Sequence, residues 1–120
     1  MWFSIDFHSH IPVYEQIKSK IKHKIMIDEI QEGEFIPSIR NLAKTLGVNL
    51  NTVARAYREL EQDGIIKSIR GKGYIVVGIQ KDDFLNKHLE EFKKQIILLK
   101  DFNLDKNILF NIIDDIFGGE

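Results

Sequence analysis

The segment 37–73 constrains the fold of this 120-residue chain more than any other part of the sequence. It predicts two short helices, a tight turn between them and a hairpin tipped by Arg70-Gly71-Lys72-Gly73. Ser38 and Asn49 are favoured helix N-caps, and Gly47 supplies the left-handed backbone at which the first helix ends. This order is that of a winged helix-turn-helix, a unit that places one helix in a DNA major groove with the hairpin beside it.

The apolar residues of this segment agree with that interpretation. Ala43 stands where two crossing helices would approach closely, Gly47 makes the turn, and Val53 anchors the second helix. The same core is expected to contain Leu42, Leu46, Val48, Ala56 and Leu60. The predicted helices run from Ser38 to Leu46 and from about Leu50 to Gln62. Two β-rich runs, 65–66 and 74–77, are expected to form the strands of the hairpin.

A third helix is predicted upstream of this unit. Pro12 suits the first position of a helix. Apolar residues follow at three- and four-residue steps, which gives the helix one buried face: Tyr14, Ile17, Ile21 and Ile25. The first eleven residues alternate loosely between apolar and polar, a pattern that fits either a short strand or an arm.

The last forty residues predict two further helices after a linker at 78–83. In the first helix, apolar residues repeat at 4-3-4-3 spacing, which is typical of a packed helix pair: Leu85, Leu89, Phe92, Ile96 and Leu99. Asn103 is expected to cap the final helix, whose apolar residues include Ile112 and Ile116. Two short helices of this composition cannot cover their own apolar surface, so a second copy of the chain is expected to cover it.

The sequence therefore predicts a mainly α fold with a small β-hairpin. A winged helix-turn-helix domain for DNA binding occupies residues 1–78, and a two-helix dimerisation module occupies residues 79–120. A two-fold dimer presents two reading helices and hence recognises a near-palindromic DNA site.

Charge is distributed unevenly between these two parts. Residues 37–78 contain seven basic and three acidic residues, a net charge of +4, whereas residues 81–120 contain six basic and nine acidic residues, a net charge of −3. A basic middle with an acidic tail suits a nucleic-acid-binding protein with a separate module that does not touch DNA. No apolar run approaches the roughly 18 residues of a membrane span, and no signal peptide is recognisable, so a cytoplasmic protein is expected.

The candidate DNA contacts lie on the two central helices and on the hairpin tip. Asn51, in the first turn of the second helix, has the amide that pairs with adenine, and the neighbouring side chains can reach a base or a phosphate. The predicted set is Arg40, Lys44, Asn49, Asn51, Thr52, Arg55, Arg70, Gly71 and Lys72. Each side chain of the set has a simpler alternative interpretation as a solvated surface residue.

Several motifs resemble the GntR family of bacterial transcription regulators. They are Pro12-Val13-Tyr14-Glu15-Gln16-Ile17, residues 36–43 around Pro37-Ser38-Ile39-Arg40, residues 51–61 and the hairpin from Gly64 to Tyr74. The resemblance implies DNA contacts by Arg40, Asn51, Thr52, Arg70 and Gly71. The short tail is similar to the YtrA-type subgroup, which implies dimerisation through the two C-terminal helices. A repressor is the expected regulator, although the sequence does not reveal whether DNA binding represses or activates.

The chain departs from the family pattern at two positions. Many relatives carry arginine where this chain has Leu50 and Ala54. Base contacts by those arginines are therefore absent, and the preferred DNA site is expected to differ. Leu50 could instead touch a thymine methyl group.

Other functions find little support in the sequence. No catalytic constellation is present, so an enzyme is not expected. There is no cysteine, and His8 and His10 lack further ligands, so no metal or cofactor is predicted. One protomer has little room for an effector pocket of ~300 Å3, although an unidentified small molecule could bind at a dimer interface. The main alternative is a winged helix that contacts protein or RNA instead of a specific DNA operator.

Overall fold

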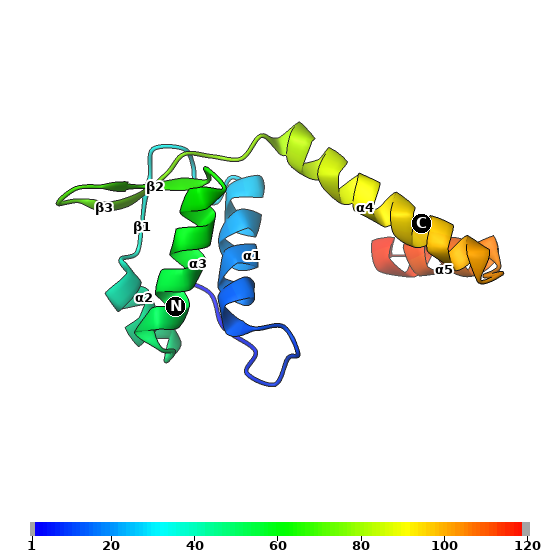
Figure 1. Cartoon of the computed structure of the whole chain (residues 1–120), viewed down its shortest axis with the longest axis horizontal. Coiled ribbons are helices and arrows are strands. Elements are labelled where there is room, and N and C mark those ends of the chain that lie inside the picture. Colours follow the sequence, from blue (N-terminus) through cyan, green and yellow to red (C-terminus); the bar gives the residue numbers. More distant parts are fainter. Residues whose placement is uncertain (1, 119–120) are drawn as a thin grey trace. The chain divides into compact units, whose positions relative to one another are not determined.

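The computed structural model describes residues 2–118, which fall into two compact units divided between Ile79 and Gln80. The first unit contains α1 (Val13–Met26), β1 (Phe35–Ile36), α2 (Ile39–Leu46), α3 (Leu50–Gln62), β2 (Ile66–Ile69) and β3 (Gly73–Val76). The second unit contains α4 (Lys81–Asp101) and α5 (Lys106–Phe117). This mainly helical fold with a small antiparallel sheet confirms the predicted fold class (Figure 1).

Three helices form the core of the first unit. α3 packs against α1 on one side and against α2 near its own beginning (Figure 1). The largest fully buried side chains come from all three helices and from the sheet: Ile17, Ile21, Leu42, Val53, Tyr57, Leu60, Ile66 and Val76. α1 begins one residue after the predicted start, because Pro12 is its N-cap. The apolar face expected for α1 is buried at Ile17, Ile21 and Ile25.

The hairpin is the larger part of a three-stranded antiparallel sheet with the strand order β1-β3-β2. β2 pairs with β3 from Ile66 opposite Val76 to Ile69 opposite Gly73. The short β1, which precedes α2, pairs with the other edge of β3. The sheet therefore connects the hairpin to the segment that leads into α2, and the orientation of the hairpin is tied to that of the helices.

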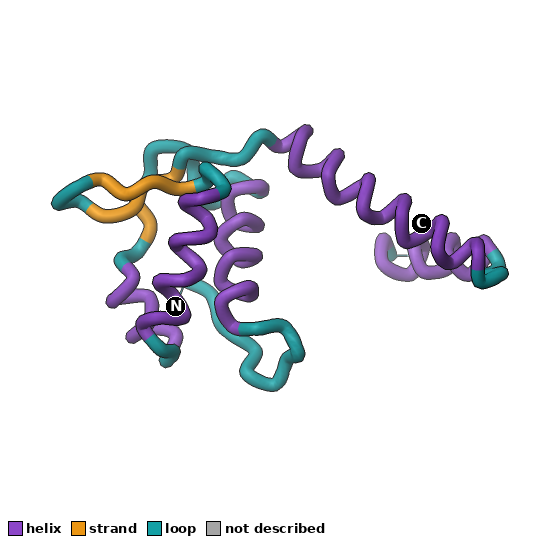
Figure 2. The backbone as a smooth tube through the Cα atoms, in the orientation of Figure 1, coloured by secondary structure: helices purple, strands orange, loops and turns teal. Residues whose placement is uncertain are grey.

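Residues 2–12, which precede α1, form an arm rather than a strand (Figure 2). Its apolar side chains Trp2, Phe3 and Ile5 pack against the core of the first unit. The buried amide of Gln16 fixes the end of the arm, because it accepts a hydrogen bond from the Asp6 N–H and donates to the carbonyls of Asp6 and Ile11, all within 2.9 Å. The arm is thus part of the folded unit.

The second unit differs from the prediction at its helix boundaries. α4 begins at Lys81, inside the segment expected to be a linker. The N-cap of α5 is Asp105, whose carboxylate accepts from the Asn107 N–H, so the prediction of Asn103 as the cap was wrong. Asn103 instead adopts a left-handed conformation (φ 64°) in the turn between the helices, which asparagine tolerates better than most residues.

The second unit has no buried core among its described residues. Within residues 2–118, no helix is long and apolar enough to cross a lipid bilayer.

Candidate nucleic-acid interface

The first turn of α3 is ordered by its own N-cap and is exposed to solvent. The Asn49 side-chain oxygen accepts a hydrogen bond from the Asn51 N–H at 2.7 Å. The cap uses only that oxygen, so the Asn49 side-chain NH2 group remains available as a donor. Leu50 and Asn51 are exposed, and Thr52 is half-buried. The turn predicted to meet base edges is therefore structured and accessible.

The turn between α2 and α3 has the geometry expected of a helix-turn-helix. Gly47 is the C-cap of α2 and has a φ of 69°. A side chain at this position would be strained by the left-handed backbone, which costs an ordinary residue about 1–2 kcal/mol. At the other end of α2, the Ser38 hydroxyl accepts from the Asn41 N–H at 3.1 Å. Each helix thus begins with the N-cap that the sequence predicted.

Tyr57 joins α3 to the start of α2 and to the hairpin. Its side chain is fully buried, and its hydroxyl donates a 2.6 Å hydrogen bond to the Pro37 carbonyl. The Tyr57 ring meets the Tyr74 ring of β3 edge-on, with centroids 5.1 Å apart. Burial raises the pKa of the Tyr57 phenol well above its ordinary value, so the group is a neutral donor at any physiological pH. One side chain thus connects three elements that carry predicted DNA contacts.

The Arg55 side chain contacts two other residues of the same unit. Its guanidinium lies 3.7 Å from the centroid of the Tyr14 ring, and its Nε donates to Glu59 at 3.0 Å. Glu59 also accepts from Lys18 of α1 at 2.8 Å. The hydrogen bond with Glu59 raises the pKa of Arg55, while the hydrogen bonds from Lys18 and then Arg55 lower the pKa of Glu59. A DNA contact by Arg55 must therefore compete with Tyr14 and Glu59.

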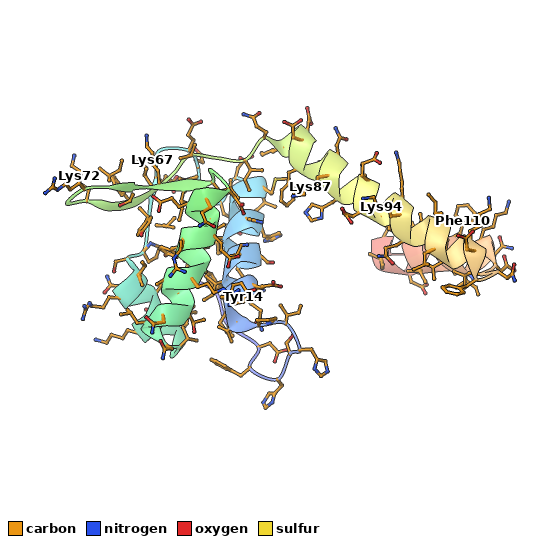
Figure 3. The ribbon with its side chains drawn as sticks, viewed as in Figure 1. Tyr14, Lys67, Lys72, Lys87, Lys94 and Phe110 are labelled. Carbon is orange, nitrogen blue, oxygen red and sulfur yellow. The ribbon has the colours of Figure 1, made fainter. Side chains whose placement is uncertain are left out.

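Other predicted cations have no such partners. Within residues 2–118, no ion pair or side-chain hydrogen bond holds Arg40, Lys44, Arg70 or Lys72, and all four are exposed. Arg40 and Lys44 lie on α2, and Lys72 lies at the hairpin tip, where its side chain points away from the helices (Figure 3). Cations without internal partners are the groups best able to bind phosphates, because no existing interaction has to be broken.

The tip of the hairpin is a tight turn with left-handed backbone. Gly71 has a φ of 75° and Gly73 a φ of 114°, and the Lys72 N–H donates to the Ile69 carbonyl at 3.0 Å. No atom lies within 4 Å of a Cβ added at Gly71. The restriction on Gly71 is therefore conformational, and the backbone at the tip is open to a partner.

The candidate contacts thus come from two helices and one hairpin of the same unit. Sequence patterns did not reveal the contact of Arg55 with Tyr14 or that of Glu59 with Lys18, because both join residues that are far apart in the sequence. Lys67, exposed on β2, is an additional cation of the hairpin outside the predicted set (Figure 3). The sequence feature that could have indicated Lys67 as a candidate DNA contact is its position in the basic segment 37–78. Within the described part of the chain, no group of three or more His, Asp or Glu side chains could hold a metal ion.

Comparison with known proteins gives concordant results. Residues 13–76 match the model of the family described as bacterial regulatory proteins, gntR family. The HTH-type transcriptional repressor YtrA of Bacillus subtilis is 36% identical over 92 residues, which cover 77% of this chain and 71% of that protein.

Two solved structures extend this comparison. A protein from Listeria monocytogenes described as a transcriptional antiterminator superposes with a TM-score of 0.75 and 34% identity, covering 94% of this chain and 87% of that one. The DNA-binding domain of AraR, solved in complex with operator ORX1, superposes with a TM-score of 0.56 and 27% identity over 62% of this chain and 94% of that one.

Proposed function

This chain belongs to the gntR family of bacterial regulatory proteins, and on that basis we propose that it is a transcriptional repressor that binds a near-palindromic operator as a homodimer. The observation that carries the proposal is the exposed first turn of α3, which lies in the same unit as the unpaired cations of α2 and of the hairpin tip. The similarity to the YtrA repressor supports repression rather than activation.

The proposed division of labour follows from the chemistry of the side chains. Asn51 reads a base edge from the first turn of α3, since its amide can both donate to and accept from adenine. Arg40, Lys44, Arg70 and Lys72 bind phosphates and position the unit on the duplex. Asn49 and Thr52 donate hydrogen bonds to a DNA phosphate beside the α3 N-terminus, where the helix dipole favours negative charge. Arg55 contributes mainly by holding α3 against α1, and Gly71 lets the hairpin tip approach the duplex closely.

The proposed homodimer is supported by the composition and exposure of the second unit. None of the side chains described for α4 and α5 is buried, and the helices expose Leu85, Leu89, Phe92 and Ile112. Ile96 and Leu99 continue the same seam of α4 and are half-buried, and Ile116 is exposed on α5. An apolar surface of this kind in a water-soluble chain marks an interface. A second copy would offer the same seam, as in other symmetric two-fold dimers.

Selection from a pool of randomised duplexes tests the proposed function. The protein should enrich an inverted repeat, and binding to it should weaken with salt with a log–log slope of roughly −5 to −8, the value expected for a few phosphate contacts per protomer. Lys87→Ala on α4, which removes a charge from the other unit, should leave the slope unchanged. Enrichment of no sequence, or binding that is indifferent to salt, would contradict the proposal.

RNA binding is the second candidate, because the Listeria protein with a similar fold is described as a transcriptional antiterminator. If the repressor proposal is right, a structured RNA with as many phosphates as the enriched duplex should compete only weakly with that duplex for the protein. RNA that displaces the duplex at equal concentration would favour the second candidate.

A further inference from the structure

The exposed first turn of α3 carries an apolar side chain. Leu50, the first residue of the helix, is 45% exposed. Among the described residues of α2 and α3, it is the one large apolar side chain that is exposed. Its exposure has no evident role in the fold, because the core of the unit is complete without it.

The helix geometry places Leu50 in a small apolar strip beside an amide. Ala54 is four residues after Leu50 and thus lies on the same face, one turn further along. Ala54 is half-buried and adds a methyl-sized surface. Asn51 is the next residue and lies about 100° around the helix from Leu50. The first two turns of α3 therefore present apolar carbon next to one donor and one acceptor.

The same two turns offer no unengaged cation. Arg55 is their only basic residue, and it is held by the Tyr14 ring and by Glu59. Guanine is read mainly by arginine or lysine donating to its O6 and N7 atoms, whereas thymine is distinguished by its C5-methyl group and adenine by paired hydrogen bonds to an amide. The first two turns of α3 thus suit A·T base pairs and lack an unengaged cation of the kind that selects G·C.

We propose that Leu50 packs against the C5-methyl group of a thymine while Asn51 pairs with an adjacent adenine, so that each half-site contains consecutive A·T base pairs under the start of α3. This assignment rests on the proposed operator-binding function and specifies the sequence class that the operator contains. It makes Leu50 a specificity-determining residue through an apolar contact that needs no hydrogen bond.

Deoxyuridine provides a direct test, since it differs from thymidine only by the absent C5-methyl group. Each thymine of the enriched operator is replaced in turn, and the affinity of the wild-type protein is measured. One replacement in each half-site should weaken binding by about fourfold per half-site, the equivalent of one buried methyl group. The same measurement with Leu50→Ala should give equal affinities for the thymine and uracil duplexes.

Ile27→Ala is the matched control, because it shortens an aliphatic side chain of the same unit that is 50% exposed and lies outside the proposed interface. It should retain the wild-type preference for thymine. The uracil measurements on the wild type do not depend on the folding of any variant. G·C pairs at the bases selected by α3, or a wild type indifferent to every uracil, would overturn the role of Leu50 and leave the proposed function standing. Failure to enrich any duplex would overturn the proposed function itself.

Discussion

Single buried polar side chains fix the segments that surround α1 and α3. The buried Tyr57 hydroxyl donates a hydrogen bond to the Pro37 carbonyl, three residues before Arg40 in the sequence. The Gln16 amide does the same for the backbone of the N-terminal arm. Unpaired polar groups in a protein interior are costly, so each of these pairs specifies one arrangement of the segments that it connects.

Tyr57→Phe should destabilise the protein by about 1–3 kcal/mol, because the Pro37 carbonyl is then buried without a partner. The free energy of unfolding from denaturant titration measures this. Tyr74→Phe is the matched control, since the Tyr74 ring packs against Tyr57 but its hydroxyl has no hydrogen-bond partner within residues 2–118. Equal stability of the two variants would show that the Tyr57 hydrogen bond contributes nothing.

Pairs of elements are joined by contacts that the sequence did not reveal. The bounds of α2 and α3 follow from local signals, namely the caps Ser38 and Asn49 and the turn at Gly47, so they could be predicted. The bond between Lys18 and Glu59 joins residues 41 positions apart, and no local pattern encodes such a partner. The N-cap of α5 was misplaced for a related reason, because Asn103 and Asp105 are both good caps and only the path of the turn distinguishes them.

The network between α1 and α3 predicts a specific response to acid. The hydrogen bonds from Lys18 and Arg55 lower the pKa of Glu59 from its ordinary value of 4.5. The stabilisation is therefore fully present above about pH 4.5 and is lost as the pH falls through the lower pKa of the folded state. Glu59→Gln should be less stable than the wild type at neutral pH, and the difference should shrink as the pH falls below about 4.5.

Thermal unfolding across this range measures the effect. Glu32→Gln, which removes an exposed carboxylate outside the network, serves as the control and should unfold in parallel with the wild type. A constant difference between Glu59→Gln and the wild type at all pH values would rule out the pairing of Glu59 with Lys18 and Arg55.

The whole molecule combines a unit with a complete core and a unit without one. Fifteen apolar side chains are buried among the described residues, and all belong to the first unit. The periodicity of α4 and α5 was visible in the sequence because it is local, whereas in the proposed dimer the surface that covers these helices would belong to the second copy. The second unit is therefore expected to be stabilised by association.

Leu89→Glu should convert the proposed dimer into a monomer. Leu89 is 52% exposed in the single chain, so a carboxylate there is tolerated by the protomer but is costly once a partner buries it. Lys87→Glu is the control, because Lys87 lies on the opposite side of α4 from Leu89. Sedimentation at about tens of micromolar should give a dimer for the wild type and the control. A monomeric wild type would contradict the proposed assembly.

The most direct measurement compares Asn51→Ala and Arg70→Ala on the enriched operator and its single-base variants at two salt concentrations. Asn51→Ala should cost about 1–3 kcal/mol on the operator and relax selectivity at one base pair in each half-site. Arg70→Ala should weaken all duplexes evenly and flatten the salt slope by about one unit per protomer. If Asn51→Ala binds with the base preference of the wild type, α3 is not the element that reads the operator.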